Sequence, residues 1–326
     1  MPLISVIIPV YNGEKTIRQT IEYVLKQSFA DWELIVINDG SQDSTLEIVS
    51  SIKDLRLKVF SYPNAGLAAS RNRGIVKASG EYISFLDADD LWTQDKLESQ
   101  LKALQENPQA AVAYSWINCI DEFGQFLRRG NHVIFNGDVY AQLLLTDFIE
   151  NGSNLLIRKQ VFDEVGNFDE LLNAVEDWDM WLRLAARYHF VCVPSPQIFY
   201  RISPNSMSTN VWKLETSCLQ VIERAFARAP EELKHLKKIS IANLYKYLTF
   251  KVLEGLPERK KGIAAIRFLY HAIKNDPSLL GERVSLKVLL KSGIMTLFPH
   301  QQAETLLTKF KTISNTTTIL GYIQLF

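Results

Sequence analysis

The chain has 326 residues, 47% of them hydrophobic and 11% aromatic, which is enough to fill the cores of a large α/β domain and a smaller one and excludes a disordered chain. Lysine plus arginine and aspartate plus glutamate both number 36, so the net charge is zero. The charge of the whole chain therefore creates no field that recruits nucleic acid or an anionic membrane, and either partner would need a local patch.

Cysteine usage and the first residues indicate the compartment. Cys119, Cys192 and Cys218 lack the spacing of a metal site, and their odd number argues against a disulfide framework, so we expect a reducing compartment. The start MPLISVIIPVYNG has no basic leader and breaks at Pro9, which is typical of a core strand rather than a signal peptide. No apolar run reaches the roughly 20 residues of a membrane span. We expect a cytoplasmic protein, and a peripheral contact with the inner face of a membrane stays open.

Apolar runs and segments with helical periodicity alternate in the first part of the chain. Helices are expected from about Ile17, after a capping box of Ser44 and Glu47, and over 67–78, ending before Gly80. The runs ISVIIPV, ELIVIN, LKVFS and YISFLD predict strands at 4–10, 33–38, 57–61 and 82–87. Continuous apolar strands separated by helices predict an α/β fold with a mainly parallel, doubly wound sheet covered on both faces.

The regular alternation of apolar runs and helical segments ends after a helix expected over 93–107. From about Trp212 onward the periodicity is helical. Between these points we expect strands at 111–116, 132–135, 154–158 and 190–193 and a helix over 176–188. The helical C-terminal extension should contain segments near 214–228, 231–256, 261–275 and 285–298. Pro, Ser and Asn in YRISPNSMSTN interrupt both periodicities, which places a boundary there and gives domains of 1–208 and 209–326.

The stretch YISFLDADDLW carries three carboxylates at the end of a predicted strand. Asp87, Asp89 and Asp90 disfavour one another's ionised form unless a cation, a base or solvent relieves them. Two aspartates separated by one residue can hold Mn²⁺ or Mg²⁺ through carboxylate oxygens. The alternative is structural, because Asp90 or Thr93 could cap the next helix.

Three predicted strand ends should meet at one edge of the sheet. Ligands of open α/β sheets bind beyond the carboxyl ends of the strands. We therefore expect Pro9 to Asn12, Asp39 and Asp87 to Asp90 to be neighbours in space, although they lie far apart in the sequence.

Five motifs occur together and in order: VYNGEKTI, NDGSQDST, NAGLAASRNRGI, DADD and VEDWDMWLRL. This array resembles the family 2 inverting glycosyltransferases of the glycosyltransferase A fold, over about residues 3–208. These enzymes transfer a sugar from a nucleotide diphosphate donor to an acceptor. The resemblance implies a nucleotide-sugar-binding part over 1–110 and an acceptor-side part over 111–208.

The resemblance also implies roles for single residues. Asp87 would face the ribose and the metal, with Asp89 as the metal ligand, and Asp39 would read the nucleotide base. Arg71 matches a basic residue near the donor. The nucleotide pocket would include Pro9, Val10 and Tyr11, with the Tyr11 ring beside the base.

The general base should lie in VEDWDMWLRL. On a helix, Asp179 pairs with Arg183 and Glu176 lies on the same side, so both acidic residues are expected to be solvated. Asp177 shares an apolar side with Trp181, which fits either a helix cap or a base at the rim of the site. The ED motif of the family implies Asp177 as the base, with Glu176 as second choice.

The resemblance implies a metal-assisted enzyme of polysaccharide or glycolipid biosynthesis. Its partners would be a UDP-sugar and a saccharide or lipid-linked saccharide acceptor, with no nucleic acid. The segment KVLLKSGIMTLF fits either a membrane surface or packing against the catalytic domain or a second subunit. The alternatives are an aspartate-nucleophile phosphohydrolase, disfavoured because the acidic pair does not follow the first strand, and a non-catalytic nucleotide-sugar binder, disfavoured because Asp89 and Asp177 are retained.

Overall fold

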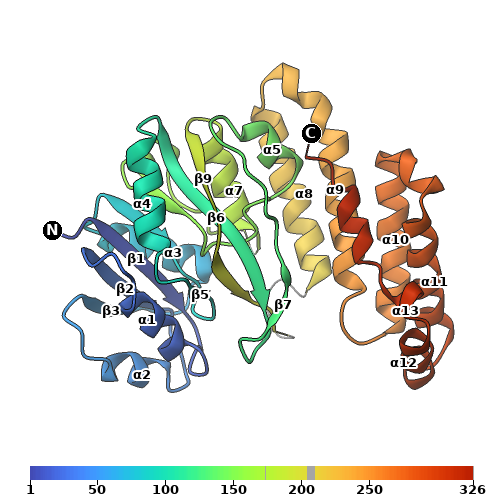
Figure 1. Cartoon of the computed structure of the whole chain (residues 1–326), viewed down its shortest axis with the longest axis horizontal. Coiled ribbons are helices and arrows are strands. Elements are labelled where there is room, and N and C mark those ends of the chain that lie inside the picture. Colours follow the sequence, from blue (N-terminus) through green and yellow to red (C-terminus); the bar gives the residue numbers. More distant parts are fainter. Residues whose placement is uncertain (173, 204–209, 326) are drawn as a thin grey trace. The chain divides into compact units, whose positions relative to one another are not determined.

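A computed structural model describes residues 1–172, 174–203 and 210–325 (Figure 1). The chain forms two compact units, the first of residues 1–140 and 147–204 and the second of 141–146 and 205–326. The boundary expected at residue 208 lies outside the described residues. The short segment 141–146 is thus the exception to a simple division along the sequence.

The first unit is built on the strands that the apolar runs predict. The bounds of the parallel strands are β1 (Ile4–Val10), β2 (Trp32–Asn38), β3 (Leu57–Ser61) and β4 (Tyr82–Phe85), in the order β3-β2-β1-β4. The connecting helices are α1 (Ile17–Leu25), α2 (Thr45–Ser51) and α3 (Leu67–Lys77), and α4 (Lys96–Glu106) follows β4. Every residue of β1 and β2 is buried, as expected for strands covered on both faces.

The same sheet continues with mixed strand directions. Its other strands are β5 (Leu91–Trp92), β6 (Ala110–Ile120), β7 (Phe126–Arg129), β8 (Leu156–Arg158) and β9 (His189–Arg201). β8 joins β4 and β6 in antiparallel pairs, β9 runs parallel to β6, and β5 and β7 add antiparallel edges. The sheet is therefore mixed, and its parallel part is formed by β1 to β4, where the apolar runs predict it.

Two local expectations are wrong. Residues 132–135 form no strand, because side chains of β6 take up backbone hydrogen-bonding groups that a strand would use. The Trp116 indole donates to the Val133 carbonyl, and the Tyr114 hydroxyl donates to the carbonyl of Phe135 and accepts its amide. Ser44 makes no side-chain cap bond at α2. Asp43 instead accepts the Thr45 amide, a role that sequence spacing did not distinguish.

The predicted meeting of strand ends is confirmed. Val10 pairs with Asn38 across β1 and β2, and the Asp39 amide donates to the Val10 carbonyl at 2.8 Å. On the other side of β1, Ile7 pairs with Phe85 of β4. The segments after β1, β2 and β4 therefore lie along one edge of the sheet.

Three helices complete the elements between β7 and β9: α5 (Tyr140–Leu145), α6 (Val161–Val165) and α7 (Glu176–Ala185).

The second unit is helical in its described residues, as predicted (Figure 1). The four predicted segments correspond to α8 (Val211–Arg228), η2 (Glu231–Leu236) with α9 (Lys237–Val252), α10 (Arg259–Asn275) and α11 (Arg283–Leu297). Elements that the sequence did not predict are η3 (Pro277–Gly281), α12 (His300–Lys309), α13 (Lys311–Ser314) and η4 (Thr317–Tyr322). Within the described ranges, no helix is long and apolar enough to cross a membrane.

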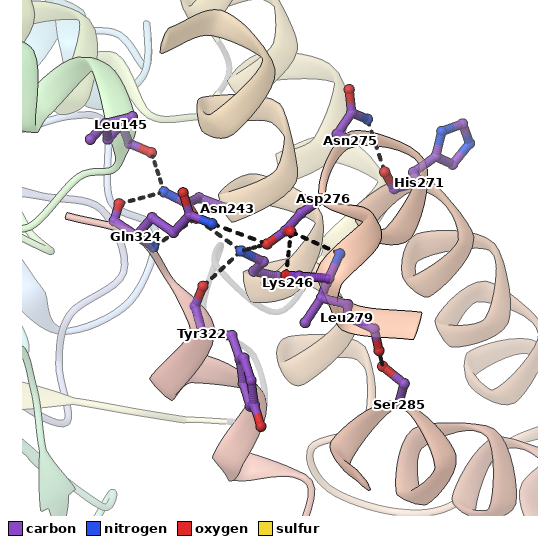
Figure 2. Close-up of polar contacts among 11 residues, drawn as sticks. Leu145, Asn243, Lys246, His271, Asn275, Asp276, Leu279, Ser285, Tyr322 and Gln324 are labelled. Carbon is purple, nitrogen blue, oxygen red and sulfur yellow. Dashed lines mark hydrogen bonds and ion pairs between the residues drawn. The ribbon is translucent and has the colours of Figure 1, made fainter. Parts of the chain in front are cut away.

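A buried polar network holds this unit together (Figure 2). Lys246 is fully buried, and its amine pairs with Asp276 at 2.8 Å and donates to the Tyr322 carbonyl at 2.7 Å. Asn243 donates to the carbonyls of Leu145 and Gln324, at 3.2 and 2.8 Å. A buried cation with a carboxylate and carbonyl partners avoids most of its desolvation penalty. The network thereby ties α5 and the segment after η4 to α9.

Candidate active site

The loop after β1 presents an exposed aromatic ring at the edge of the sheet. Tyr11 is 51% exposed, whereas the preceding residues Pro9 and Val10 are buried. Asn12 has a left-handed backbone, with φ 51°, and its amide donates to the Ser41 hydroxyl while its side chain accepts the Gln42 amide. These bonds tie the loops after β1 and β2 together and hold Tyr11 at the rim.

Asp39 lies at the same rim but is only 3% exposed. Its carboxylate accepts the amides of Ala65 and Gly66, at 3.0 and 2.8 Å, and pairs with Arg73 at 2.8 Å. Asp39 therefore fixes the loop before α3, whether or not it also reads a base. Sequence reasoning missed Arg73, although its position two residues beyond Arg71 in SRNRG was a signal.

Asp90 is fully buried and has a structural role. Its carboxylate accepts the Ser153 hydroxyl at 2.6 Å, the Asn151 side chain at 3.0 Å and the Arg201 backbone amide at 2.9 Å. Burial and the neighbouring aspartates raise the pKa of Asp90 well above its ordinary value. α4 begins only at Lys96, so the expectation that Asp90 caps this helix is wrong.

Asp89 is half-buried beside a buried arginine that sequence reasoning missed. Arg201 donates to the Asp89 carbonyl at 2.7 Å and to the side chain of Gln19 at 3.0 Å. Burial and the charge of Asp87 raise the pKa of Asp89 to about 6, against the opposing charge of Arg201. In the part of the chain that the structure describes, no side chain donates a hydrogen bond to the Asp89 carboxylate.

The carboxylates of Asp87 and Asp89 fit a hard divalent cation. A carboxylate whose ionisation is disfavoured by burial and by a second carboxylate is relieved by a positive ion. Among the described residues, however, no group of three or more His, Cys, Asp or Glu side chains could hold a metal. Asp89 and Asp87 would thus share the ion with water and phosphate, as is usual for Mg²⁺. The segment SPNSMS after β9 offers hydroxyl and amide side chains as further candidate ligands; Ser203 is described, whereas residues 205, 206 and 208 lie outside the described residues.

Arg71 connects the aspartate pair to the helix with the ED motif. Its side chain is 1% exposed, and its two terminal nitrogens pair with Asp87 at 2.8 Å and Glu176 at 2.7 Å. A Cβ atom added at Gly152 would collide with the guanidinium, so only glycine leaves room for it. Burial opposes the charge of Arg71, but Asp87, Glu176 and Asp177 outweigh it and raise the pKa of Arg71.

The expectation that Glu176 and Asp179 are solvated is wrong. Arg71 lies 105 positions from Glu176 and buries it in an ion pair that helical periodicity cannot show. The predicted pair of Asp179 and Arg183 is confirmed at 2.8 Å, but it is largely buried because Arg183 also donates to the carbonyls of Val165 and Asn167. Both acidic residues therefore fix α7 in place.

Asp177 is half-buried in the first turn of α7. Its Oδ1 accepts the Trp178 amide at 2.8 Å, as a residue at a helix start can. Burial and the charges of Glu176 and Asp147 raise the pKa of Asp177 well above its ordinary value, although Arg71 opposes this. The Asp177 carboxylate is thus partly exposed and has a raised proton affinity, and general-base catalysis requires both properties.

Two further acidic residues belong to this electrostatic environment. Burial raises the pKa of Asp147 and of Glu150 to about 7. Asp147 accepts the amides of Ile149 and Glu150, and Glu150 accepts the Asn131 amide from a backbone with φ 70°. Sequence reasoning missed both, although the acidic residues in TDFIENGSN lie between apolar neighbours and were a weak signal.

Solved structures share this fold. S. aureus TarS in complex with UDP matches over 98% of this chain and 90% of that chain, with a TM-score of 0.59 and 22% identity. The mannosyltransferase PcManGT of Pyrobaculum calidifontis, in complex with GDP-Man and Mn²⁺, covers 98% and 87%, with a TM-score of 0.59 and 17% identity. At these identities the likeness shows the fold alone, which is the glycosyltransferase A fold.

The chain belongs to the family described as glycosyltransferase like family 2, whose model matches residues 5–252. A relative from Escherichia coli, the UDP-Glc:alpha-D-GlcNAc-diphosphoundecaprenol beta-1,3-glucosyltransferase WfgD, is 32% identical over 221 residues, covering 65% of this chain and 81% of WfgD. Against five uncharacterized glycosyltransferases of Rickettsia and Haemophilus influenzae, the chain spans only 26 to 64% of their length.

Proposed function

We propose that the chain is an inverting glycosyltransferase that moves a sugar from a UDP-sugar to a hydroxyl of a lipid-linked saccharide. The observation that carries the proposal is the double ion pair of Arg71 with Asp87 and Glu176. It joins the acidic pair expected to face the donor to the helix that carries the expected base. One buried guanidinium then sets the spacing of both halves of the reaction.

The donor side uses residues 1–110. The exposed ring of Tyr11, which follows the buried residues Pro9 and Val10, offers a surface on which a nucleotide base can stack. Asp39 holds the loop of Ala65 and Gly66 beside that surface, and its acceptor oxygens favour the imide N–H of uracil. Support for UDP comes from WfgD, which is named for a UDP-Glc donor, and from the TarS complex with UDP.

Asp89 and Asp87 would hold Mn²⁺ or Mg²⁺, which supplies Lewis-acid stabilisation of the diphosphate leaving group. The Asp89 carboxylate is available to bind a cation because no side chain among the described residues donates a hydrogen bond to it. Arg201 fixes the backbone at Asp89 through the carbonyl oxygen. Arg71 fixes the side chain of Asp87. The chain's own role on this side is to orient two carboxylates.

The acceptor side uses residues 111–208. Asp177 takes the proton of the acceptor hydroxyl while that oxygen attacks the anomeric carbon from the face opposite the diphosphate. The bond from the anomeric carbon to the diphosphate oxygen breaks, and the nucleoside diphosphate leaves with that electron pair. Glu176 is already paired with Arg71 and is less free to accept the proton.

The biosynthetic role follows from the relatives. WfgD acts, by its name, on a diphosphoundecaprenol-linked sugar, and TuaG of Bacillus subtilis, 32% identical over 218 residues, is named as putative in teichuronic acid biosynthesis. We assign this chain to polysaccharide or glycolipid assembly on that basis.

The function can be tested with a panel of nucleotide sugars. One UDP-sugar should raise the melting temperature, and more so with Mn²⁺, because a ligand that binds the native state alone stabilises it. That donor should release UDP, and release should accelerate with a polyprenyl diphosphate-linked saccharide. Hydrolysis of simple phosphomonoesters without any use of UDP-sugars would instead support the phosphohydrolase alternative. If a donor binds but no supplied acceptor leads to turnover, the result would support a non-catalytic binder.

A further inference from the structure

The zero net charge of the chain conceals an opposition between its two units. The second unit carries 18 lysine and arginine residues against nine acidic residues, a net charge of +9. The first unit carries 18 against 27, a net charge of −9. Such asymmetry between parts of a chain is typical of proteins that bind an anionic surface through one part. A local basic patch, which binding to an anionic partner would need, is therefore to be sought in the second unit.

The exposed face of α10 combines basic and apolar side chains. Ile263, Ile266 and Tyr270 are 52%, 41% and 62% exposed. Exposed basic residues occupy the same face: Arg259, Lys260, Arg267 and Lys274. At 3.6 residues per turn, all seven side chains lie within a stripe of about 120°, and no acidic residue lies in it. The opposite face of α10 is buried in the unit.

A hollow of about 640 Å³ adjoins this stripe. Trp212, at the start of α8 and 48% exposed, lines it together with Ile263 and Lys260 of α10. Its remaining charged residues are engaged elsewhere: Glu258 pairs with Lys261 at 2.7 Å, and Arg267 pairs with Glu215. Across residues 210–325, as far as the structure describes them, no carboxylate pairs with Lys260. The hollow thus offers an apolar wall beside an unpaired amine.

We propose that this α10 face, with Trp212, is a docking surface for a membrane that contains anionic lipids. Tyrosine and tryptophan favour the interface between headgroups and acyl chains, isoleucines can insert there, and basic side chains attract anionic headgroups. Contact with nucleic acid phosphates would leave the two isoleucines without a role. A second copy of the same face would bring two basic stripes together, which like charge disfavours.

Membrane docking does not depend on the proposed function, because it requires no catalytic residue. If both hold, the enzyme meets a lipid-linked acceptor on the surface to which it is bound; this consequence rests on the proposed function. The inference also replaces the earlier expectation for KVLLKSGIMTLF. The exposed residues Leu286, Leu289 and Leu290 of α11, a helix that also carries Arg283 and Lys287, are the rival surface.

The experiment is sedimentation of the full chain with vesicles of phosphatidylcholine, alone or mixed equally with phosphatidylglycerol. Binding should require the anionic lipid and should weaken as salt rises. Lys260→Ser with Lys274→Ser should reduce the partition coefficient by about 25-fold, since each basic group near the surface contributes roughly fivefold. Ile263→Ser with Ile266→Ser should weaken binding without any change of charge.

The matched control is Lys234→Ser with Lys238→Ser, which removes the same charge from exposed positions of the same unit outside α10. It should retain binding to within a few-fold. Equal weakening by the control, or native binding by both α10 variants, would overturn the assignment of this face. The same holds if Leu286→Ser with Leu290→Ser abolishes binding while the α10 variants retain it, or if the α10 variants dissociate an oligomer in vesicle-free solution.

Discussion

The two units hold buried charge in different ways. In the helical unit, Lys246 has a carboxylate partner, and the lysine lowers the pKa of Asp276 against the opposing effect of burial. In the sheet unit, burial and the charge of neighbouring carboxylates raise the pKa values of Asp89, Asp147 and Asp177. A paired charge stabilises a fold, whereas carboxylates kept in a costly environment point to a function that uses them. Changes in the two groups should therefore have separable effects.

The largest effect on transfer is expected at Asp177. Asp177→Asn retains the shape and can still accept the Trp178 amide, but it cannot take a proton from the acceptor at neutral pH. Loss of a positioned general base typically costs about 10²- to 10⁴-fold in rate. Transfer rate, donor affinity and melting temperature should be measured on one preparation, and only the first should change. A normal transfer rate would move the search to Glu176.

The opposite pattern is expected in the helical unit. Lys246→Met leaves Asp276 unpaired, and breaking a buried pair in this way costs about 3 to 5 kcal/mol of unfolding free energy. Below the lowered melting temperature, the transfer rate should stay native. The control is Lys246→Met with Asp276→Leu, which removes both charges and should recover part of the loss. A variant with native melting temperature but impaired transfer would contradict the division between the units.

Metal dependence should follow the ionisation of Asp89. Asp89→Asn removes the main anchor, and loss of about 3 kcal/mol of leaving-group stabilisation corresponds to roughly 10²-fold in rate. In the native protein the pKa of Asp89 is raised to about 6, so protons compete with the cation below that pH. Mn²⁺ affinity, measured by calorimetry with UDP present, should fall as pH decreases from 7 to 5. Affinity that rises over this range, or full metal stimulation of the variant, would exclude Asp89 as the ligand.

A smaller effect should follow from moving Arg71 while keeping its charge. Arg71→Lys cannot pair with two carboxylates in a fixed fork, and the added Cβ atom of Gly152→Ala collides with the guanidinium and displaces it. Each should slow transfer by about 10- to 100-fold, since small misplacements cost that much, with donor affinity less affected. Gly293→Ala, which points into open space, is the control. Native transfer in both variants would show that the ion pairs do not position the site.

The fold was predictable because its signals are local. Continuous apolar runs specify buried parallel strands, and the edge where ligands bind follows from strand direction, so Tyr11, Asp39 and Asp89 could be grouped in advance. The contacts of these residues were not predictable. Arg71 with Glu176 and Arg73 with Asp39 join positions far apart in the chain, and no periodicity encodes such pairs. Likewise, a net charge of zero gave no sign that one unit is basic and the other acidic.

The central claim is that Asp177 takes the acceptor's proton, and a nucleophile that carries no proton tests it most directly. Azide is anionic at neutral pH and needs no base to attack the anomeric carbon. With the identified UDP-sugar and Mn²⁺, the Asp177→Ala variant should lose transfer to the hydroxyl acceptor yet form the inverted glycosyl azide at a rate comparable to the native enzyme. Unimpaired transfer to the hydroxyl acceptor by the same variant would contradict the account.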